Sequence, residues 1–141
     1  MTTLENNWTR PDSGYRKFIA SVLTHALSRE LARKNFEAVN ESNIDLHNPE
    51  SDTADVMVYD VNTNYSPSLM IELCNQSNEE NTIRTVEVIR NFFNVREAFI
   101  YNIETEKWLN LSPLKNTLTS FSEQFKLELG QLLSKYLHRY I

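Results

Sequence analysis

Two acidic residues stand inside apolar, strand-like segments of this chain. Asp55 lies in the run Ala54-Asp55-Val56-Met57-Val58-Tyr59, and Glu72 lies in the run Ser68-Leu69-Met70-Ile71-Glu72-Leu73-Cys74. A buried carboxylate is costly to desolvate unless a cation or hydrogen bonds compensate its charge. If the two strands are neighbours in register, the acids meet and predict a cation site. Ligands that are all oxygen favour Mg²⁺ or Mn²⁺.

Such a site could act on a phosphodiester. A phosphate oxygen could complete the coordination shell, and the metal would polarise the phosphoryl group and help to ionise an attacking water. A structural interpretation stands beside this one, because structural networks of ion pairs also perturb acids. In that case Asp55 closes a strand end by accepting backbone amides, and Glu72 pairs with Arg84 or Arg90.

Helical patterns frame the two acids on both sides. Before them, apolar residues recur every three or four positions over 15–34, which predicts a helix. After them, Ser77-Asn78-Glu79-Glu80 matches a capping box and predicts a helix over about 78–93. A third helix is predicted over 118–140, near the end of the chain.

Strand patterns fill the stretches between these helices. Runs of branched and apolar residues bounded by turn-forming residues predict the strands. The order helix, strands, helix, strands, helix predicts an α/β fold in which helices cover both faces of a mixed sheet. The predicted strands are 54–60, 68–74, 98–101 and 107–111, preceded by a hairpin made from 36–41 and 44–46.

Composition limits the classes of protein that the chain can belong to. Its 141 residues are 40% hydrophobic, enough for one sizeable core, so we expect a single domain over 1–141 with 1–12 loosely ordered. The net charge of −5 argues against nonspecific coating of nucleic acid, although a local basic groove remains compatible with it.

Further absences in the sequence set expectations about compartment and cofactor. A single cysteine permits no intramolecular disulfide, no apolar run is long enough to span a membrane, and the N-terminus lacks the apolar core of a signal peptide. We therefore expect a cytoplasmic protein without a membrane partner. Glycine occurs only at Gly14 and Gly130, so there is no glycine-rich phosphate loop, and we expect no small-molecule cofactor.

The acids and the elements around them resemble the core of the PD-(D/E)XK nuclease superfamily. Within it, the likeness is to compact restriction-endonuclease-like domains of cyanobacteria and other bacteria, and it covers about residues 15–111. The resemblance implies a restriction-endonuclease-like mixed sheet flanked by helices, and a Mg²⁺- or Mn²⁺-dependent nuclease that acts on DNA or RNA. The matching stretches are Ala54-Asp55, Met70-Ile71-Glu72-Leu73, Asn75-Gln76-Ser77 and Asn94-Val95-Arg96-Glu97-Ala98-Phe99.

The sequence departs from the superfamily at the motif lysine. Cys74 stands two residues after the glutamate, and Val86 stands at the alternative position on the following helix, so neither position is charged. Arg84 and Arg90 flank Val86, and either could supply a cation, although arginine is a poor proton acceptor. The resemblance therefore implies a weakened catalytic set, namely Asp55, Glu72, Cys74, Arg84 and Arg90.

Some members of the superfamily add another acid to the metal site. Glu30, on the predicted first helix, resembles that acid, so the implied metal ligands are Asp55, Glu72 and Glu30, with Glu41 as a second candidate. Helical glutamates are more often solvated surface residues.

An alternative of a different class is a fold that has lost its chemistry and binds protein or nucleic acid, including as a homodimer. The uncharged residues at both lysine positions and the negative net charge favour it. Specific binding of Mn²⁺ would favour the enzyme.

Overall fold

The fold is seen in a computed structural model that describes residues 14–48 and 50–140. Its centre is a five-stranded sheet in the order β1-β2-β3-β4-β5. Neighbouring strands are antiparallel except β3 and β4, which run parallel because a helix crosses over between them. The sheet is therefore mixed, as predicted. Its strands are β1 (Phe36–Asn43), β2 (Thr53–Asp60), β3 (Ser66–Cys74), β4 (Glu97–Asn102) and β5 (Lys107–Leu111).

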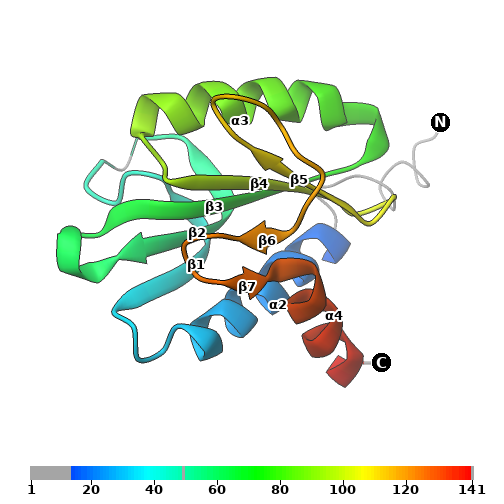
Figure 1. Cartoon of the computed structure of the whole chain (residues 1–141), viewed down its shortest axis with the longest axis horizontal. Coiled ribbons are helices and arrows are strands. Elements are labelled where there is room, and N and C mark those ends of the chain that lie inside the picture. Colours follow the sequence, from blue (N-terminus) through cyan, green and yellow to red (C-terminus); the bar gives the residue numbers. More distant parts are fainter. Residues whose placement is uncertain (1–13, 49, 141) are drawn as a thin grey trace.

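Helices cover both faces of this sheet (Figure 1). The helices α2 (Gly14–Glu30) and α4 (Leu129–Leu137) pack on one face, and α3 (Glu79–Phe93) covers the other. Because successive side chains of a strand point to opposite faces, the sheet separates two apolar cores. The core beneath α2 and α4 includes Val56, Leu69 and Ile71, and the core beneath α3 includes Met57, Met70 and Cys74.

The first helix follows the predicted periodicity. Its buried residues are spaced three or four apart and include Ile19, Leu23 and Leu27. It ends at Glu30 rather than at residue 34, and Asn35 with φ of 62° then turns the chain into β1. The expectation that 1–12 are loosely ordered lies outside the described residues.

The predicted early hairpin is wrong. In the structure β1 is one continuous strand that pairs with β2 from Phe36 opposite Asp60 to Asn43 opposite Thr53. Ile44 follows the strand, and its N–H donates to the carbonyl of Asp52 at 2.8 Å, which closes a loop between the two strands. The long edge of β2 gave this segment a better partner than a short hairpin of its own.

The predicted C-terminal helix over 118–140 begins too early in the sequence. The helix α4 begins only at Leu129, and the preceding residues form the short antiparallel strands β6 (Phe121–Ser122) and β7 (Leu127–Glu128). Lys126 has φ of 56° in the turn between them, which breaks the helical pattern. The apolar spacing of this segment therefore reflects two structures in sequence rather than one helix.

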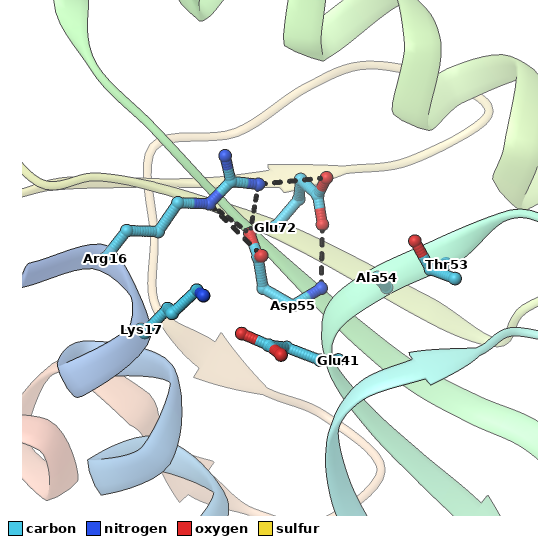
Figure 2. A pocket seen from close by; sticks show the side chains of 7 residues that line it. All are labelled: Arg16, Lys17, Glu41, Thr53, Ala54, Asp55 and Glu72. Carbon is cyan, nitrogen blue, oxygen red and sulfur yellow. Dashed lines mark hydrogen bonds and ion pairs between the residues drawn. The ribbon is translucent and has the colours of Figure 1, made fainter. Parts of the chain in front are cut away.

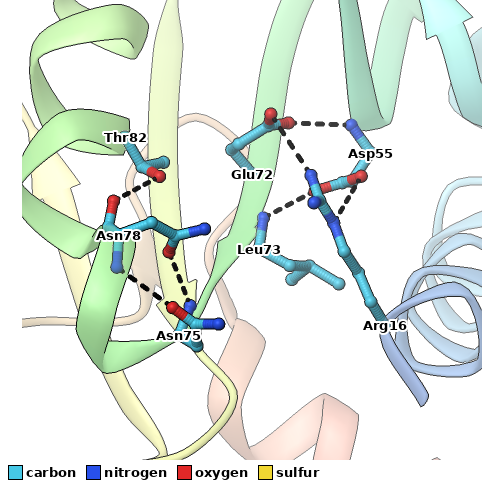
Figure 3. Close-up of polar contacts among 7 residues, drawn as sticks. All are labelled: Arg16, Asp55, Glu72, Leu73, Asn75, Asn78 and Thr82. Atoms are coloured by element: carbon cyan, nitrogen blue, oxygen red, sulfur yellow. Dashed lines mark hydrogen bonds and ion pairs between the residues drawn. The ribbon is translucent and has the colours of Figure 1, made fainter. Parts of the chain in front are cut away.

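The helix α3 forms as predicted, but a different residue caps the turn before it. A 3₁₀ turn (Gln76–Asn78) precedes α3, and Asn75 with Asn78 forms the capping box. The N–H of Asn78 donates to Asn75 Oδ1 at 3.0 Å, and the N–H of Asn75 donates to Asn78 Oδ1 at 2.9 Å (Figure 3). Ser77, the predicted cap, is exposed and donates only to the Asn75 side chain.

We therefore expect Asn75→Ala to lower the free energy of unfolding by about 1 kcal/mol, because it leaves the amide of Asn78 without its acceptor. Ser77→Ala is the matched control and should cost less than about 0.5 kcal/mol. Urea denaturation of both variants at one pH measures the difference. Equal losses in the two variants would contradict this assignment of the cap.

Candidate active site between the central strands

The strands β2 and β3 separate at the point where they carry the two acids. Their last paired residues on this side are Val56 and Ile71. Beyond this pair β2 stays with β1, and β3 stays with β4. Asp55 and Glu72 come next in each strand, so their side chains lie where the two central strands part.

The two carboxylates replace the missing bonds between the strands. The N–H of Asp55 donates to Glu72 Oε1 at 2.9 Å, and the N–H of Leu73 donates to Asp55 Oδ2 at 2.7 Å (Figure 3). Each acid is thus held by a backbone amide of the other strand. The structure brings the two acids together, at the place where the strand register predicts that they meet.

Arg16, in the first turn of α2, binds both acids. Its Nε donates to the two oxygens of Asp55 at 3.1 and 3.2 Å, and its Nη2 donates to Asp55 Oδ2 at 2.8 Å. The same Nη2 lies 3.6 Å from Glu72 Oε2. The side chains of Arg16, Asp55 and Glu72 are 23%, 13% and 22% exposed, so water screens this cluster only in part. One guanidinium thus faces two carboxylates.

This imbalance of charge is visible in the acid that lies farther from the arginine. Burial and the charge of Asp55 raise the pKa of Glu72 to about 8. The amide of Asp55 and the guanidinium of Arg16 act in the opposite direction but do not cancel those effects. The cluster therefore has room for further positive charge, which would favour the ionised form of Glu72.

A pocket of about 320 Å³ opens beside the pair. Figure 2 shows the Lys17 side chain of α2 directed toward the space between Asp55 and Glu41. Glu41 has φ of 53°, a left-handed conformation that is uncommon for a residue inside a strand. It lies in β1 between Asn40, which is opposite Val56, and Ser42, which is opposite Ala54. The pocket is lined by Arg16, Lys17, Glu41, Thr53, Ala54, Asp55 and Glu72.

The structure does not bring the two predicted arginines to the acids. Arg84 lies exposed on α3 with its Nη2 3.8 Å from Glu80 Oε2. Arg90 donates from Nη2 to the carbonyl of Arg96 at 3.1 Å. The cations that do reach the pocket, Arg16 and Lys17, come instead from the first helix.

The two expected lysine positions are both inside the core beneath α3. Cys74 is fully buried and Val86 is 1% exposed. Burial raises the pKa of the Cys74 thiol to about 12, so it is neutral at ordinary pH and is unsuited to act as a nucleophile.

Of the two predicted additional acids, only Glu41 lines the pocket. Glu30 is the last residue of α2, fourteen positions after Arg16, and a helix rises about 1.5 Å per residue, which separates them by about 20 Å. Over residues 14–48 and 50–140, no three His, Cys, Asp or Glu side chains are arranged to hold a metal ion. Asp55 and Glu72 are the two carboxylates that meet at the site, and Glu41 is a further carboxylate in the lining of the pocket.

Arg16 and Lys17 were not among the predicted site residues. One signal for Arg16 is present in the sequence, because it precedes the buried Ile19 by three positions and the buried Leu23 by seven. This spacing puts a basic residue on the face of α2 that packs on the sheet. A cation so placed needs an acidic partner on the sheet, and Asp55 is that partner.

Comparisons with known proteins establish the fold. No protein-family model and no curated protein sequence matches the chain. The structure is similar to the crystal structure of a "putative nuclease belonging to DUF820" from Anabaena variabilis, with a TM-score of 0.68 and 12% sequence identity over 90% of this chain and 85% of that one. The chain therefore has a restriction-endonuclease-like fold, which confirms the predicted fold class. Separately, among the described residues no helix is long and apolar enough to cross a membrane.

Proposed function

We propose that this chain is a metal-dependent nuclease-like protein that hydrolyses phosphodiester bonds in DNA or RNA, with catalysis weakened by the loss of the motif lysine. The observation that carries the proposal is the meeting of Asp55 and Glu72 between the parting strands, beside an open pocket. The likeness of the fold to a structure described as a nuclease supports it.

The chemistry of the donor set suits Mg²⁺ or Mn²⁺. Asp55 and Glu72 offer carboxylate oxygens, and Mg²⁺ commonly takes one or two carboxylates and keeps several waters or substrate phosphates as its other ligands. Arg16 already places a positive charge between the same two acids, which supports a cation at this point. A divalent ion bound there would supply Lewis acidity toward a phosphoryl oxygen and would promote ionisation of the attacking water.

Other residues of the pocket would bind the phosphate and accept a proton. Lys17 lines the pocket and takes the place of the motif lysine as a mobile point charge for a phosphate. Arg16 offers a planar donor group that could bind phosphate oxygens in pairs. Glu41 also lines the pocket, and its carboxylate would accept a proton from water. The amides of Asp55 and Leu73 hold the acids in position.

Cleavage of single- and double-stranded DNA and RNA in Mn²⁺ tests the proposal. We expect slow cleavage by the natural chain, and at least about tenfold less by Glu72→Gln, because that variant removes a charged metal ligand but keeps the shape of the side chain. Glu80→Gln, on the exposed face of α3, removes the same charge and should leave cleavage unchanged. Cleavage that is absent, or equal in the natural chain and Glu72→Gln, would refute the proposal.

One observation favours the noncatalytic alternative. Arg16 binds Asp55 through two nitrogens, and such a pair is a stable structural element in its own right. If it is permanent, the fold binds nucleic acid or protein without metal chemistry. Tight binding of nucleic acid in EDTA, together with no cleavage in Mn²⁺, is the result that distinguishes this alternative.

A further inference from the structure

We infer that Arg16 is an internal counter-ion that holds the Asp55–Glu72 pair when no metal is bound and leaves the pair when a divalent cation enters. The inference rests on the proposed function, because it concerns the regulation of the same site. It makes α2 the element that couples metal loading to the exposure of a phosphate-binding guanidinium.

The Asp55 carboxylate is already bound by the Arg16 guanidinium and by a backbone amide. A carboxylate oxygen has two lone pairs for hydrogen bonds or metal coordination. Asp55 Oδ2 accepts from Leu73 N at 2.7 Å and from Arg16 Nη2 at 2.8 Å, and Arg16 Nε lies 3.2 Å away as well. This oxygen is therefore saturated. The other oxygen, Oδ1, accepts from Arg16 Nε at 3.1 Å, so the guanidinium contacts both oxygens of Asp55. Because the Leu73 amide is fixed in β3 beside β4, the guanidinium is the group that a metal would displace.

The two oxygens of Glu72 are bound differently from each other. Its Oε1 accepts from the amide of Asp55 at 2.9 Å, whereas its Oε2 lies 3.6 Å from Arg16 Nη2, which is longer than a hydrogen bond. Glu72 is therefore held more loosely by the same guanidinium that binds Asp55. A divalent ion between the two carboxylates would therefore stand within a few ångströms of the guanidinium, and like charges at such distances repel strongly in a partly buried site.

The position of Arg16 on its helix makes the withdrawal feasible. Arg16 lies in the first turn of α2, and its side chain remains 23% exposed. A long side chain at the edge of a pocket can change rotamer without moving the helix. Once released, the fork of Arg16 stays beside the pocket, next to Lys17, where a phosphate group would meet both cations.

Binding of Mn²⁺ without nucleic acid, measured by isothermal titration calorimetry, tests the inference. We expect Arg16→Gln to bind Mn²⁺ about tenfold more tightly than the natural chain, since the competitor is gone. Arg16→Lys keeps the charge but loses the fork and should fall between the two. Arg96→Gln removes an exposed arginine next to β4 and should match the natural chain. Adding Asp55→Asn to Arg16→Gln should abolish binding.

A second measurement uses the natural chain and remains informative if Arg16→Gln fails to fold. The Nε–H signal of Arg16 in nitrogen-15 NMR, assigned by its loss in Arg16→Lys, should move toward the position of a solvated arginine as Mg²⁺ is added. The change should saturate with the Mg²⁺ affinity that a parallel calorimetric titration with Mg²⁺ gives. A signal that does not move while Mg²⁺ binds would overturn the inference.

The outcomes separate this inference from the proposed function. Equal or weaker Mn²⁺ binding by Arg16→Gln, with binding by the natural chain, overturns the inference and leaves the nuclease proposal standing. Binding by Arg16→Gln alone supports the inference and counts against activity in the natural chain. No binding by either folded protein at millimolar Mn²⁺ refutes both.

Discussion

Replacing Glu97 by alanine is expected to lower the free energy of unfolding by about 3 kcal/mol. Glu97 is 9% exposed, and its carboxylate accepts three hydrogen bonds from residues of a single turn. It accepts from Ser122 Oγ at 2.6 Å, from the N–H of Glu123 at 2.8 Å and from Gln124 Nε2 at 2.9 Å. Alanine leaves the fully buried hydroxyl of Ser122 and a backbone amide without this acceptor, and unpaired buried donors are costly.

Guanidinium chloride denaturation at neutral pH measures this loss. Glu123→Ala is the control, because it removes an exposed glutamate from the same turn but keeps the backbone N–H that Glu97 binds. Its effect should stay within about 0.5 kcal/mol. Gln124 also donates to the carbonyl of Ser68 in β3 at 2.7 Å, so the turn links the C-terminal hairpin to the central sheet. A loss below about 1 kcal/mol in Glu97→Ala would show that this link is dispensable.

Glu97 also shows why local sequence patterns do not predict the turn at 122–124. Periodicity of two and of three to four residues finds elements whose side chains pack against one layer, and it located α2, α3 and the strands β2 to β5. The turn at 122–124 is instead set by an acid 25 positions or more earlier in the sequence. No local pattern reports such a partner, and the spacing of Phe121 and Phe125 by itself predicts a helix. In the structure Phe125 packs edge-to-face on Phe36 from outside any helix.

Local sequence likewise predicts the acids of the candidate site but not its cation. An ionisable residue in an apolar strand conflicts with its surroundings, and this conflict is visible in the local sequence. The expected lysine positions lie on β3 and α3, but in the structure the cation is Arg16 of α2. Arg16 and Asp55 are 39 positions apart, and only the packing of α2 against the sheet brings them together. The positive charge beside the two acids thus comes from α2, whereas Cys74 on β3 and Val86 on α3 are uncharged and buried.

The second large effect that we expect is a loss of stability as the pH rises. The pKa of Glu72 is raised from 4.5 to about 8 in the folded protein by burial and by the charge of Asp55. Between these values the folded protein keeps a proton that the unfolded chain releases, so the free energy of unfolding falls with rising pH and levels off above the folded pKa. Each pKa unit corresponds to about 1.4 kcal/mol. Because the side chain is 22% exposed and water screens part of its charge, we expect a loss on the order of 3 kcal/mol.

Comparison with Glu72→Gln isolates this contribution from every other titrating group. Glutamine resembles the protonated acid and can still accept the Asp55 amide, so the variant should match the natural chain near about pH 5. At about pH 8.5 it should be the more stable of the two, by on the order of 3 kcal/mol. Urea denaturation in EDTA at both pH values gives the difference without interference from divalent cations. A difference that stays constant with pH would mean that Glu72 is ionised throughout, and that Arg16 alone is enough to balance the two acids.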